Sequence, residues 1–218
     1  MKPDKTYAAK ILRRLAKKYP QAGCSLTYLD PQQLLVATIL SAQCTDVRVN
    51  MVTPGLFKKY PTAHDFAAAK ISELEEDIRS TGFYHNKAKN IKGACQIIDE
   101  KYGGQVPSEM AKLVELPGVG RKTANCVLGN GFGIAVGVVV DTHVDRLSHR
   151  LGLSEANSPE KIEQDLMQLF PQKNWIAISH QLILLGRESC PARKPKCDTC
   201  VLNDICPRVG MKNEEFRD

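Results

Sequence analysis

The sequence predicts an all-α protein. Apolar residues recur at intervals of three and four over much of the chain, which is the spacing of a helix with one buried face. Two segments open with an N-cap residue followed by proline, Asp30-Pro31 and Ser158-Pro159, and this pair is typical of a helix N-terminus. Only Phe132 to Val140 resembles a strand. Because no partner strand is evident, we expect a buried extended connection there.

The helices can be placed in chain order from these signals. Ile11, Leu12 and Leu15 lie on one face of an amphipathic helix within the first 18 residues. Ser72 and Glu75 fit a capping box, S-x-x-E, at the start of another helix. The other helices are expected where apolar residues share a face: 31–42, 91–102, 158–170 and 175–185.

Composition limits the class of protein. The 218 residues are 43% hydrophobic, enough for one large domain or two small ones, and the net charge of +6 favours a polyanionic partner. No apolar stretch is long enough to span a membrane, and the N-terminus lacks the apolar region of a signal peptide. We therefore expect a cytoplasmic monomer, associated with the nucleoid if the source is a prokaryote.

The eight cysteines fall into two groups. Four of them follow the spacing C-x6-C-x2-C-x5-C near the C-terminus: Cys190, Cys197, Cys200 and Cys206. Four clustered thiolates suit either a cubane iron–sulfur cluster or a closed zinc site. The others are scattered singly and are interpreted as free core thiols: Cys24, Cys44, Cys95 and Cys126.

A glycine-containing turn is expected between two helices at residues 113–124, which follow the pattern h-x-x-h-P-G-h-G-x-x-x-A. Gly118 and Gly120 allow positive φ and a close backbone approach, and Ala124 is small enough for close helix packing. The second helix begins near Gly120, where its free N–H groups and its dipole form a seat for phosphate. The full pattern is that of a helix-hairpin-helix motif and favours DNA backbone binding over a plain helical turn.

Two residues near this turn are candidates for chemistry. Lys122 lies in the first turn of the second helix, where the helix dipole favours a neutral, nucleophilic amine, although a lysine there can also be a simple phosphate contact. Asp141 follows an apolar run and is either the N-cap of the helix that runs to Arg150 or a catalytic carboxylate. The spacing alone leaves both alternatives open.

The chain resembles the endonuclease III family of the helix-hairpin-helix Gly/Pro…Asp superfamily. The resemblance rests on residues 34–50, 81–91, 116–125 and 140–146 and on the four-cysteine loop. It implies two helical lobes with the active site in the cleft between them. Residues 24–134 would form a six-helix domain that contains the hairpin, and residues 1–23 and 135–210 would form the iron–sulfur domain, followed by a loose tail at 211–218.

The resemblance also implies a role for each matching residue. Lys122 would be the Schiff-base nucleophile and Asp141 the carboxylate that activates it. A [4Fe–4S] cluster would be bound by the four clustered cysteines, and a monovalent cation would bind at the hairpin. The implied DNA contacts are Gln43, Phe83, Gly118, Val119, Gly120, Arg121, Thr123, Arg193, Lys194 and Lys196.

Gln43 would fill the gap left by a flipped nucleotide. Two other positions, Phe83 and Asp145, depart from what the family leads us to expect. Phe83 stands where the family usually has a smaller apolar wedge. Asp145 places a negative charge just after the catalytic segment, where DNA would not favour it.

The implied activity is base excision from duplex DNA that contains oxidised pyrimidines or abasic sites, with strand cleavage by β-elimination. Adenine glycosylases and thymine-mismatch glycosylases of the same fold usually have another residue in place of Lys122, so lysine favours a lyase. The alternative from a different class is a non-catalytic DNA-binding scaffold with a structural metal site.

Overall fold

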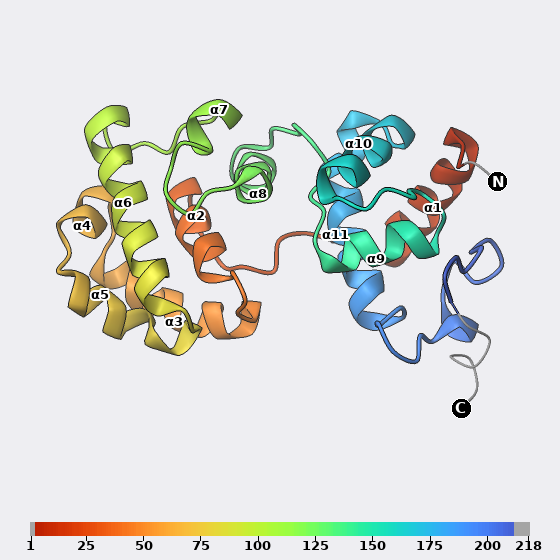
Figure 1. Ribbon diagram of the computed structural model, residues 1–218, viewed down its shortest axis with the longest axis horizontal. Coiled ribbons are helices and arrows are strands. Elements are labelled where there is room, and N and C mark those ends of the chain that lie inside the picture. The colour runs from red at the N-terminus through yellow and green to blue at the C-terminus, as the bar shows by residue number, and fades with distance from the viewer. Residues whose placement is uncertain (1–2, 212–218) are drawn as a thin grey trace. The chain divides into compact units, whose positions relative to one another are not determined.

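Every element of secondary structure in the computed structural model is helical over the residues that the structure describes, 3–211 (Figure 1). The predicted all-α class is therefore confirmed. The chain divides into two compact units, Cys24–Ile134 and a second unit made of the segments before and after it. The loose tail expected at 211–218 lies outside the described residues from 212 onward.

The unit Cys24–Ile134 contains seven α-helices and one 3-10 helix, all within the described residues. The extra helix relative to the expected six is α7, a single turn of 4 residues. The helices are α2 (Pro31–Leu40), α3 (Asp46–Lys59), α4 (Ala63–Ala68), α5 (Ile71–Ile78), η1 (Arg79–Thr81), α6 (Tyr84–Tyr102), α7 (Met110–Leu113) and α8 (Arg121–Phe132).

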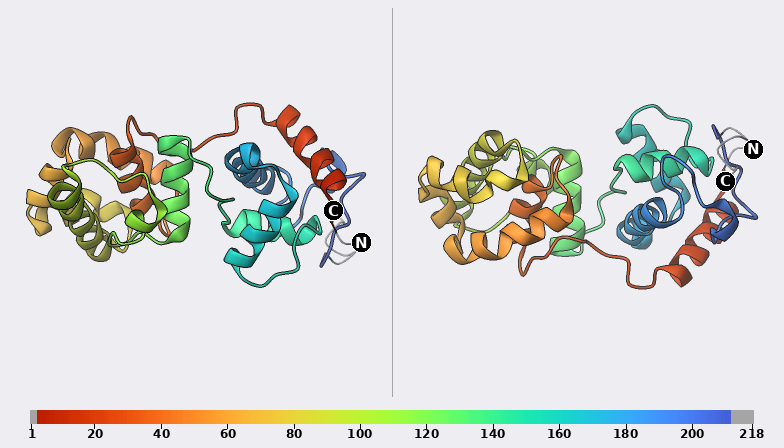
Figure 2. Two further views of the ribbon diagram at one scale, coloured as in Figure 1. Left: turned by 90° about the horizontal axis from the view of Figure 1, so that it is seen from above. Right: turned by 90° about the horizontal axis from the view of Figure 1, so that it is seen from below.

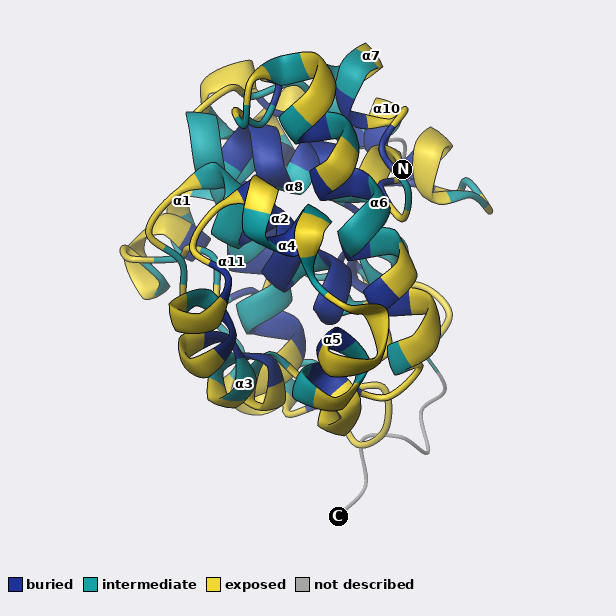
Figure 3. Ribbon diagram, turned by 90° about the vertical axis from the view of Figure 1, so that its left-hand side faces the viewer, coloured by how far each residue is buried: buried dark blue, intermediate teal, exposed yellow. Residues whose placement is uncertain are grey.

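Helix α2 forms the centre of this unit. It packs against α3, α6 and α8 (Figures 1 and 2), and its sequence PQQLLVATIL contains no charged residue. Asp30 accepts a hydrogen bond from the Gln33 N–H at 2.8 Å and Pro31 opens the helix, as the sequence predicts. The surrounding helices are amphipathic and turn their buried faces inward (Figure 3).

The predicted capping box at Ser72 is wrong. Helix α5 begins at Ile71 after Lys70, so Ser72 lies inside the first turn, where its hydroxyl cannot act as the N-cap. A capping box does occur at the start of α4, where Thr62 and Asp65 cap each other's backbone N–H groups. The capping box at Thr62 does not match the pattern S-x-x-E, because aspartate replaces glutamate at the fourth position.

The hairpin between α7 and α8 depends on one of its two glycines. Gly118 has φ +76°, and a Cβ atom there would lie 2.8 Å from the Cβ of Asn90 on α6. Gly120 has φ −84°, and no atom lies within 4 Å of the position of its missing Cβ. The expected requirement for glycine therefore holds at Gly118 and not at Gly120.

The second unit contains the N-terminal helix and the C-terminal part of the chain. Its elements are α1 (Lys5–Lys18), α9 (Thr142–Arg150), α10 (Pro159–Leu169), η2 (Gln172–Asn174), α11 (Trp175–Glu188) and η3 (Cys197–Thr199). The apolar helix α11 contacts α1 and α9, and α9 also contacts α10. Ile11, Leu15, Leu182 and Leu185 belong to its core. Among the described residues, no helix combines the length and apolarity needed to cross a bilayer.

The connection after α8 is not part of a sheet, but the expected buried extended segment Phe132–Val140 is only partly confirmed. Helix α8 runs through Phe132, Gly133 has φ +70°, and Ile134 is 40% exposed. Val138 and Val140 are buried in the core of the second unit. The backbone N–H of Val139 donates to the hydroxyl of Ser179 on α11 at 3.0 Å. The Ser179 hydroxyl thus satisfies a backbone N–H that a neighbouring strand would satisfy in a sheet.

Gly118→Ala tests the hairpin. We expect the substitution to lower the free energy of unfolding by at least about 1–3 kcal/mol, because alanine disfavours positive φ and its methyl group would collide with Asn90. Gly120→Ala is the matched control and should change stability by less than about 0.5 kcal/mol. Urea denaturation of both variants measures the difference, and equal losses would contradict this account of the turn.

Candidate active site

The hairpin exposes the start of α8. Gly120 is the N-cap and has no side chain to bind the first-turn N–H groups. Gly118, Gly120 and Arg121 are exposed, and Thr123 is half-buried. Val119 differs, since its side chain is buried and its N–H donates to the Leu116 carbonyl at 3.0 Å. Neither the side chain nor the backbone N–H of Val119 can therefore bind a phosphate.

Lys122 is exposed on the first turn of α8. The helix holds its Cα through the same packing that buries Ala124, Val127 and Leu128 on the opposite face. An amine on a rigid helix, next to a phosphate seat, can reach a sugar bound at that seat.

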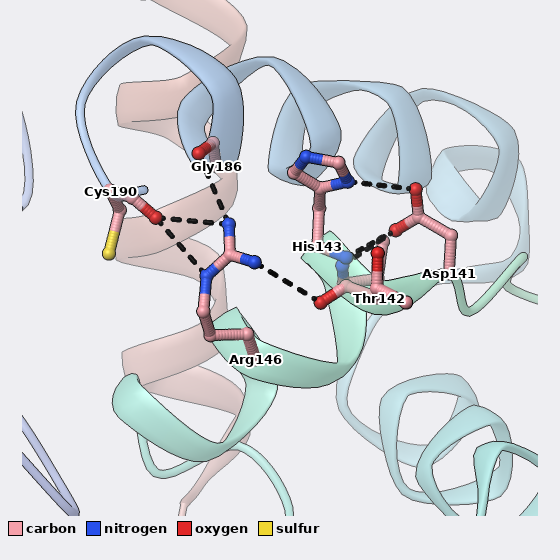
Figure 4. Close-up of polar contacts among 7 residues, drawn as sticks. Asp141, Thr142, His143, Arg146, Gly186 and Cys190 are labelled. Atoms are coloured by element: carbon pink, nitrogen blue, oxygen red, sulfur yellow. Dashed lines mark hydrogen bonds and ion pairs between the residues drawn. The ribbon is translucent and has the colours of Figure 1, made fainter. Parts of the chain in front are cut away.

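Asp141 is held in one orientation by three N–H groups (Figure 4). Its Oδ1 accepts from the backbone N–H groups of His143 and Val144, each at 2.8 Å, and its Oδ2 lies 3.1 Å from Nδ1 of His143. Asp141 is therefore the N-cap of α9, as one sequence interpretation proposed. Its side chain is 18% exposed, so the carboxylate remains reachable while it caps the helix.

Cationic and titratable groups face Asp141 from two helices. Burial lowers the pKa of His180 on α11, while the charge of Asp141 acts in the opposite direction. The pKa of Arg146 is lowered by burial and by the nearby Arg150, and the charge of Asp141 partly compensates. The Asp141 carboxylate is therefore half-buried, and its negative charge interacts with both His180 and Arg146.

Arg146 joins the helix that bears Asp141 to the cysteine loop (Figure 4). Its guanidinium donates to the carbonyl of Thr142 at 3.4 Å, to that of Gly186 at 3.2 Å and to that of Cys190 at 3.1 Å. At the same place α9 crosses α11 closely, since a Cβ on Gly186 would lie 3.0 Å from the Cβ of His143. Sequence analysis singled out neither Arg146 nor Gly186, although both lie within or next to the recognised segments.

The four C-terminal cysteines surround a common cavity. All four line it, together with apolar side chains such as Leu147, Leu151, Leu185 and Leu202. A cubane cluster needs four thiolates spread around it, and a cavity lined by all four cysteines fits a [4Fe–4S] cluster.

The electrostatics of the cavity agree with this assignment. Burial raises the pKa of the Cys200 and Cys206 thiols, and neighbouring cysteine charges raise both further. Four thiolates therefore need a positively charged group among them. Arg150 donates to the Sγ of Cys190 at 3.2 Å and to the carbonyls of Pro191 and Ala192 at 2.7 and 2.9 Å. Arg208 also lines the cavity.

The loop inside this motif is basic and exposed. Arg193, Lys194 and Lys196 are all exposed, as expected for phosphate contacts. Lys194 has φ +50°, an uncommon conformation for a side chain other than glycine. Hydrogen bonds from Tyr19 and Lys18 hold the pKa of the Glu188 carboxyl below its usual range, and the charge of Lys196 adds to the shift.

Gln43 and Phe83 also occupy strained positions, with φ of +52° and +49°. Gln43 is exposed between α2 and α3, and Phe83 is 64% exposed at the start of α6. Lys87 on α6 is buried, and its amine donates to the Thr81 carbonyl at 2.8 Å. Strained, exposed side chains that the surrounding structure holds are typical of functional sites. No pattern in the sequence indicates that Lys87 is buried.

Asp145 has a local partner. One of its carboxylate oxygens lies 3.3 Å from Nδ1 of His149, one turn later on α9. The negative charge is therefore balanced within the helix when His149 is protonated.

Comparison with known families identifies the kind of protein. Residues 36–172 match the HhH-GPD superfamily of base excision DNA repair proteins. Residues 190–206 match the iron–sulfur binding domain of endonuclease III, and a [4Fe–4S] cluster is therefore the cofactor of this chain.

Individual proteins are similar over nearly the whole length. The endonuclease III of Synechocystis sp. is 57% identical over 207 residues, which cover 95% of this chain and 94% of the relative. A solved structure of a non-covalent endonuclease III–DNA complex is 44% identical, with a TM-score of 0.90 over 94% of this chain and 96% of that one. A trapped endonuclease III–DNA covalent intermediate is also 44% identical, with a TM-score of 0.89 over 94% of this chain and 97% of that one. The chain belongs to the endonuclease III family of the HhH-GPD superfamily.

Proposed function

We propose that this enzyme removes oxidised pyrimidines from duplex DNA and cleaves the resulting abasic site, with Lys122 as nucleophile and Asp141 as the carboxylate that serves it. As a member of the endonuclease III family, the chain is a base excision repair DNA glycosylase. The observation that carries the proposal is a lysine amine on the first turn of the helix that follows the hairpin.

DNA would bind mainly through its phosphates. The uncapped N–H groups at the start of α8 can donate to a phosphate oxygen, and the exposed Arg121, Arg193 and Lys194 can contact phosphates further along. A monovalent cation at the hairpin would assist by neutralising charge. These contacts do not read sequence, as suits an enzyme that must find lesions anywhere.

The damaged nucleotide would leave the duplex to reach the amine. An oxidised pyrimidine stacks and pairs poorly, so its extrusion costs less than that of a normal base. Gln43 and Phe83 are exposed, project from the described turns and are held in strained conformations. We propose that they fill the space left in the stack, with the phenyl ring of Phe83 stacking on the neighbouring base.

The chemistry follows from a neutral amine. The nitrogen of Lys122 would attack C1′ of the deoxyribose while the bond from C1′ to the base breaks and the base leaves. Opening of the sugar ring then gives an imine between Lys122 and C1′. Loss of a proton from C2′ allows the bond from C3′ to its phosphate oxygen to break, which nicks the strand on the 3′ side.

Asp141 would assist by charge and by proton transfer. Its Oδ1 accepts from two backbone N–H groups of α9, whereas its Oδ2 contacts Nδ1 of His143. Oδ2 is therefore the atom that can accept a proton from the lysine ammonium or stabilise positive charge on the sugar.

Four cysteines would bind the cluster: Cys190, Cys197, Cys200 and Cys206. The cluster would have a structural role. It would fix the basic loop from Arg193 to Lys196, while Arg150 orients the first ligand. We place the enzyme in the cytoplasm, at the nucleoid of a bacterial cell, because the similar proteins are bacterial and the proposed substrate is chromosomal DNA.

Lys122→Ala tests the nucleophile. We expect no borohydride-trapped adduct with DNA that contains thymine glycol or an abasic site, because the variant has no amine at this position. Duplex binding should change only a few-fold, since the hairpin backbone remains. Lys122→Arg keeps the charge without a nucleophilic amine and should also fail to trap, whereas Lys112→Ala on α7 should trap normally. Trapping by Lys122→Ala would refute the assignment of the nucleophile, whereas failure of the unsubstituted protein to trap would favour the DNA-binding scaffold.

Asp141→Asn separates catalysis from helix capping. Asparagine still offers an oxygen to the His143 and Val144 N–H groups, so the free energy of unfolding should change little. Base release should slow by about 10²–10⁴-fold, because the carboxylate charge and its basicity are lost. Asp30→Asn at the N-cap of α2 is the matched control and should alter neither quantity. A loss of rate no greater than the loss of stability would show that Asp141 acts only as a cap.

Arg150→Gln tests the orientation of the cluster ligands. The variant loses donors to the Cys190 sulfur and to two loop carbonyls, so we expect cluster affinity to fall by about 10–100-fold. Iron content and visible charge-transfer absorption of the purified protein measure the loss. Arg13→Gln, on the exposed side of α1, is the control. Full iron content in Arg150→Gln would contradict this role.

A further inference from the structure

Lys87 is a buried amine that the proposed repair chemistry does not use. It lies in the first turn of α6, and only 4% of the residue is exposed. Its amine donates to the backbone carbonyl of Thr81 at 2.8 Å, and Thr81 is buried as well. Burial lowers the pKa of the Lys87 amine, because a charged group is poorly solvated in the interior of a protein. The hydrogen bond to Thr81 is therefore the contact that can explain a lysine at this position.

The carbonyl that Lys87 binds lies at the end of a helical segment. Helix α5 continues directly into η1, and η1 ends at Thr81. The last carbonyls of a helix have no partner within it and carry the negative end of the helix dipole, so an amine is a suitable cap for them. The hydroxyl of Thr81 also donates to the carbonyl of Ile78 at 2.8 Å. The end of this segment is thus fixed by one hydrogen bond from outside and one from within.

Phe83 follows this end after a single glycine. Gly82 has φ +71° and Phe83 has φ +49°, so two successive residues adopt positive φ. Phe83 is the N-cap of α6, and its side chain makes no capping hydrogen bond. The backbone N–H of Lys87 donates to the Phe83 carbonyl at 3.1 Å. Lys87 therefore binds this turn on both sides of Gly82, with its amine before the glycine and its backbone after it.

We propose that Lys87 is a positioning residue, which holds Phe83 in the conformation from which its ring enters the base stack. The inference rests on the proposed function of Phe83 in filling the gap left by the extruded nucleotide. Because Lys87 is buried, it acts through the turn and does not touch DNA. Phe83 is 64% exposed, so the backbone of the turn, more than side-chain packing, determines where the ring lies.

Lys92, on the same helix, provides a matched control. Its amine donates to the carbonyls of Ala67 and Ala69 at the end of α4, the latter at 2.7 Å. It therefore makes the same kind of hydrogen bond as Lys87, but to carbonyls outside the Phe83 turn. Methionine is flexible, apolar and without a donor, so Lys87→Met and Lys92→Met each remove one amine while the side chain still fills space. Thermal unfolding of both variants measures the loss of stability that the missing hydrogen bonds cause.

A double-mutant cycle on the cluster-loaded protein tests the proposal. We expect Lys87→Met and Phe83→Ala each to slow single-turnover release of thymine glycol from duplex DNA by about 10-fold, because the ring is misplaced in one variant and absent in the other. The double variant should be no slower than Phe83→Ala alone, since a ring that is absent cannot also be misplaced. Lys92→Met should slow release by less than about 2-fold, and its effect should multiply with that of Phe83→Ala.

Two results would overturn the proposal: effects of Lys87→Met and Phe83→Ala that multiply, and equal effects of Lys87→Met and Lys92→Met on release. Release at the unsubstituted rate by Phe83→Ala would overturn both this inference and the proposed role of Phe83. Borohydride trapping of the same samples at an abasic site shows separately whether the chemistry of Lys122 stands.

A second variant keeps the test available if Lys87→Met does not fold. Thr81→Val removes the hydroxyl that donates to the Ile78 carbonyl and so loosens the same turn. In the cycle with Phe83→Ala it should also leave the double variant no slower than Phe83→Ala alone. Multiplying effects would show that the hydrogen bonds of this turn do not position the ring, and would overturn the proposal.

Discussion

The close packing of α9 on α11 is the constraint on which the C-terminal unit depends. Glycine at position 186 leaves room for the His143 side chain, and Arg146 then reaches the carbonyls of Thr142, Gly186 and Cys190. The carboxylate of Asp141 and the first cluster ligand are therefore parts of one rigid arrangement. The cluster loop and the helix that bears Asp141 share the guanidinium of Arg146, so loss of the cluster is expected to disturb the position of Asp141.

In the unit Cys24–Ile134, the packing around the central helix α2 supports the exposed groups that we propose contact DNA. An uncharged α2 fills the centre, and the hairpin, the Gln43 turn and the Phe83 turn project from the helices around it. Gln43, Phe83 and Lys194 each have positive φ without being glycine. Such conformations cost about 1–3 kcal/mol each and persist only where the surrounding packing holds them. Their presence at three proposed DNA contacts agrees with preorganised side chains.

Much of the fold could be predicted because local signals were strong. Asp30-Pro31 and Ser158-Pro159 gave correct helix starts, since N-caps and N1 prolines act through their immediate neighbours. The prediction failed at Ser72, because the N-cap of α5 is Lys70, two residues earlier than the motif suggests. Asp141 shows the limit of such signals, because the same carboxylate caps α9 and leaves Oδ2 facing His143.

The sequence by itself determined the helical class, the cysteine set and the identity of the candidate nucleophile and carboxylate, because each depends on residue type and short spacing. Only the tertiary structure decided which glycine of the hairpin is required, which carbonyls Arg146 joins, and that Lys87 is buried. These contacts join residues far apart in the chain or depend on a backbone angle. They are set by packing, which acts between residues whose separation in sequence carries no information about their distance in space.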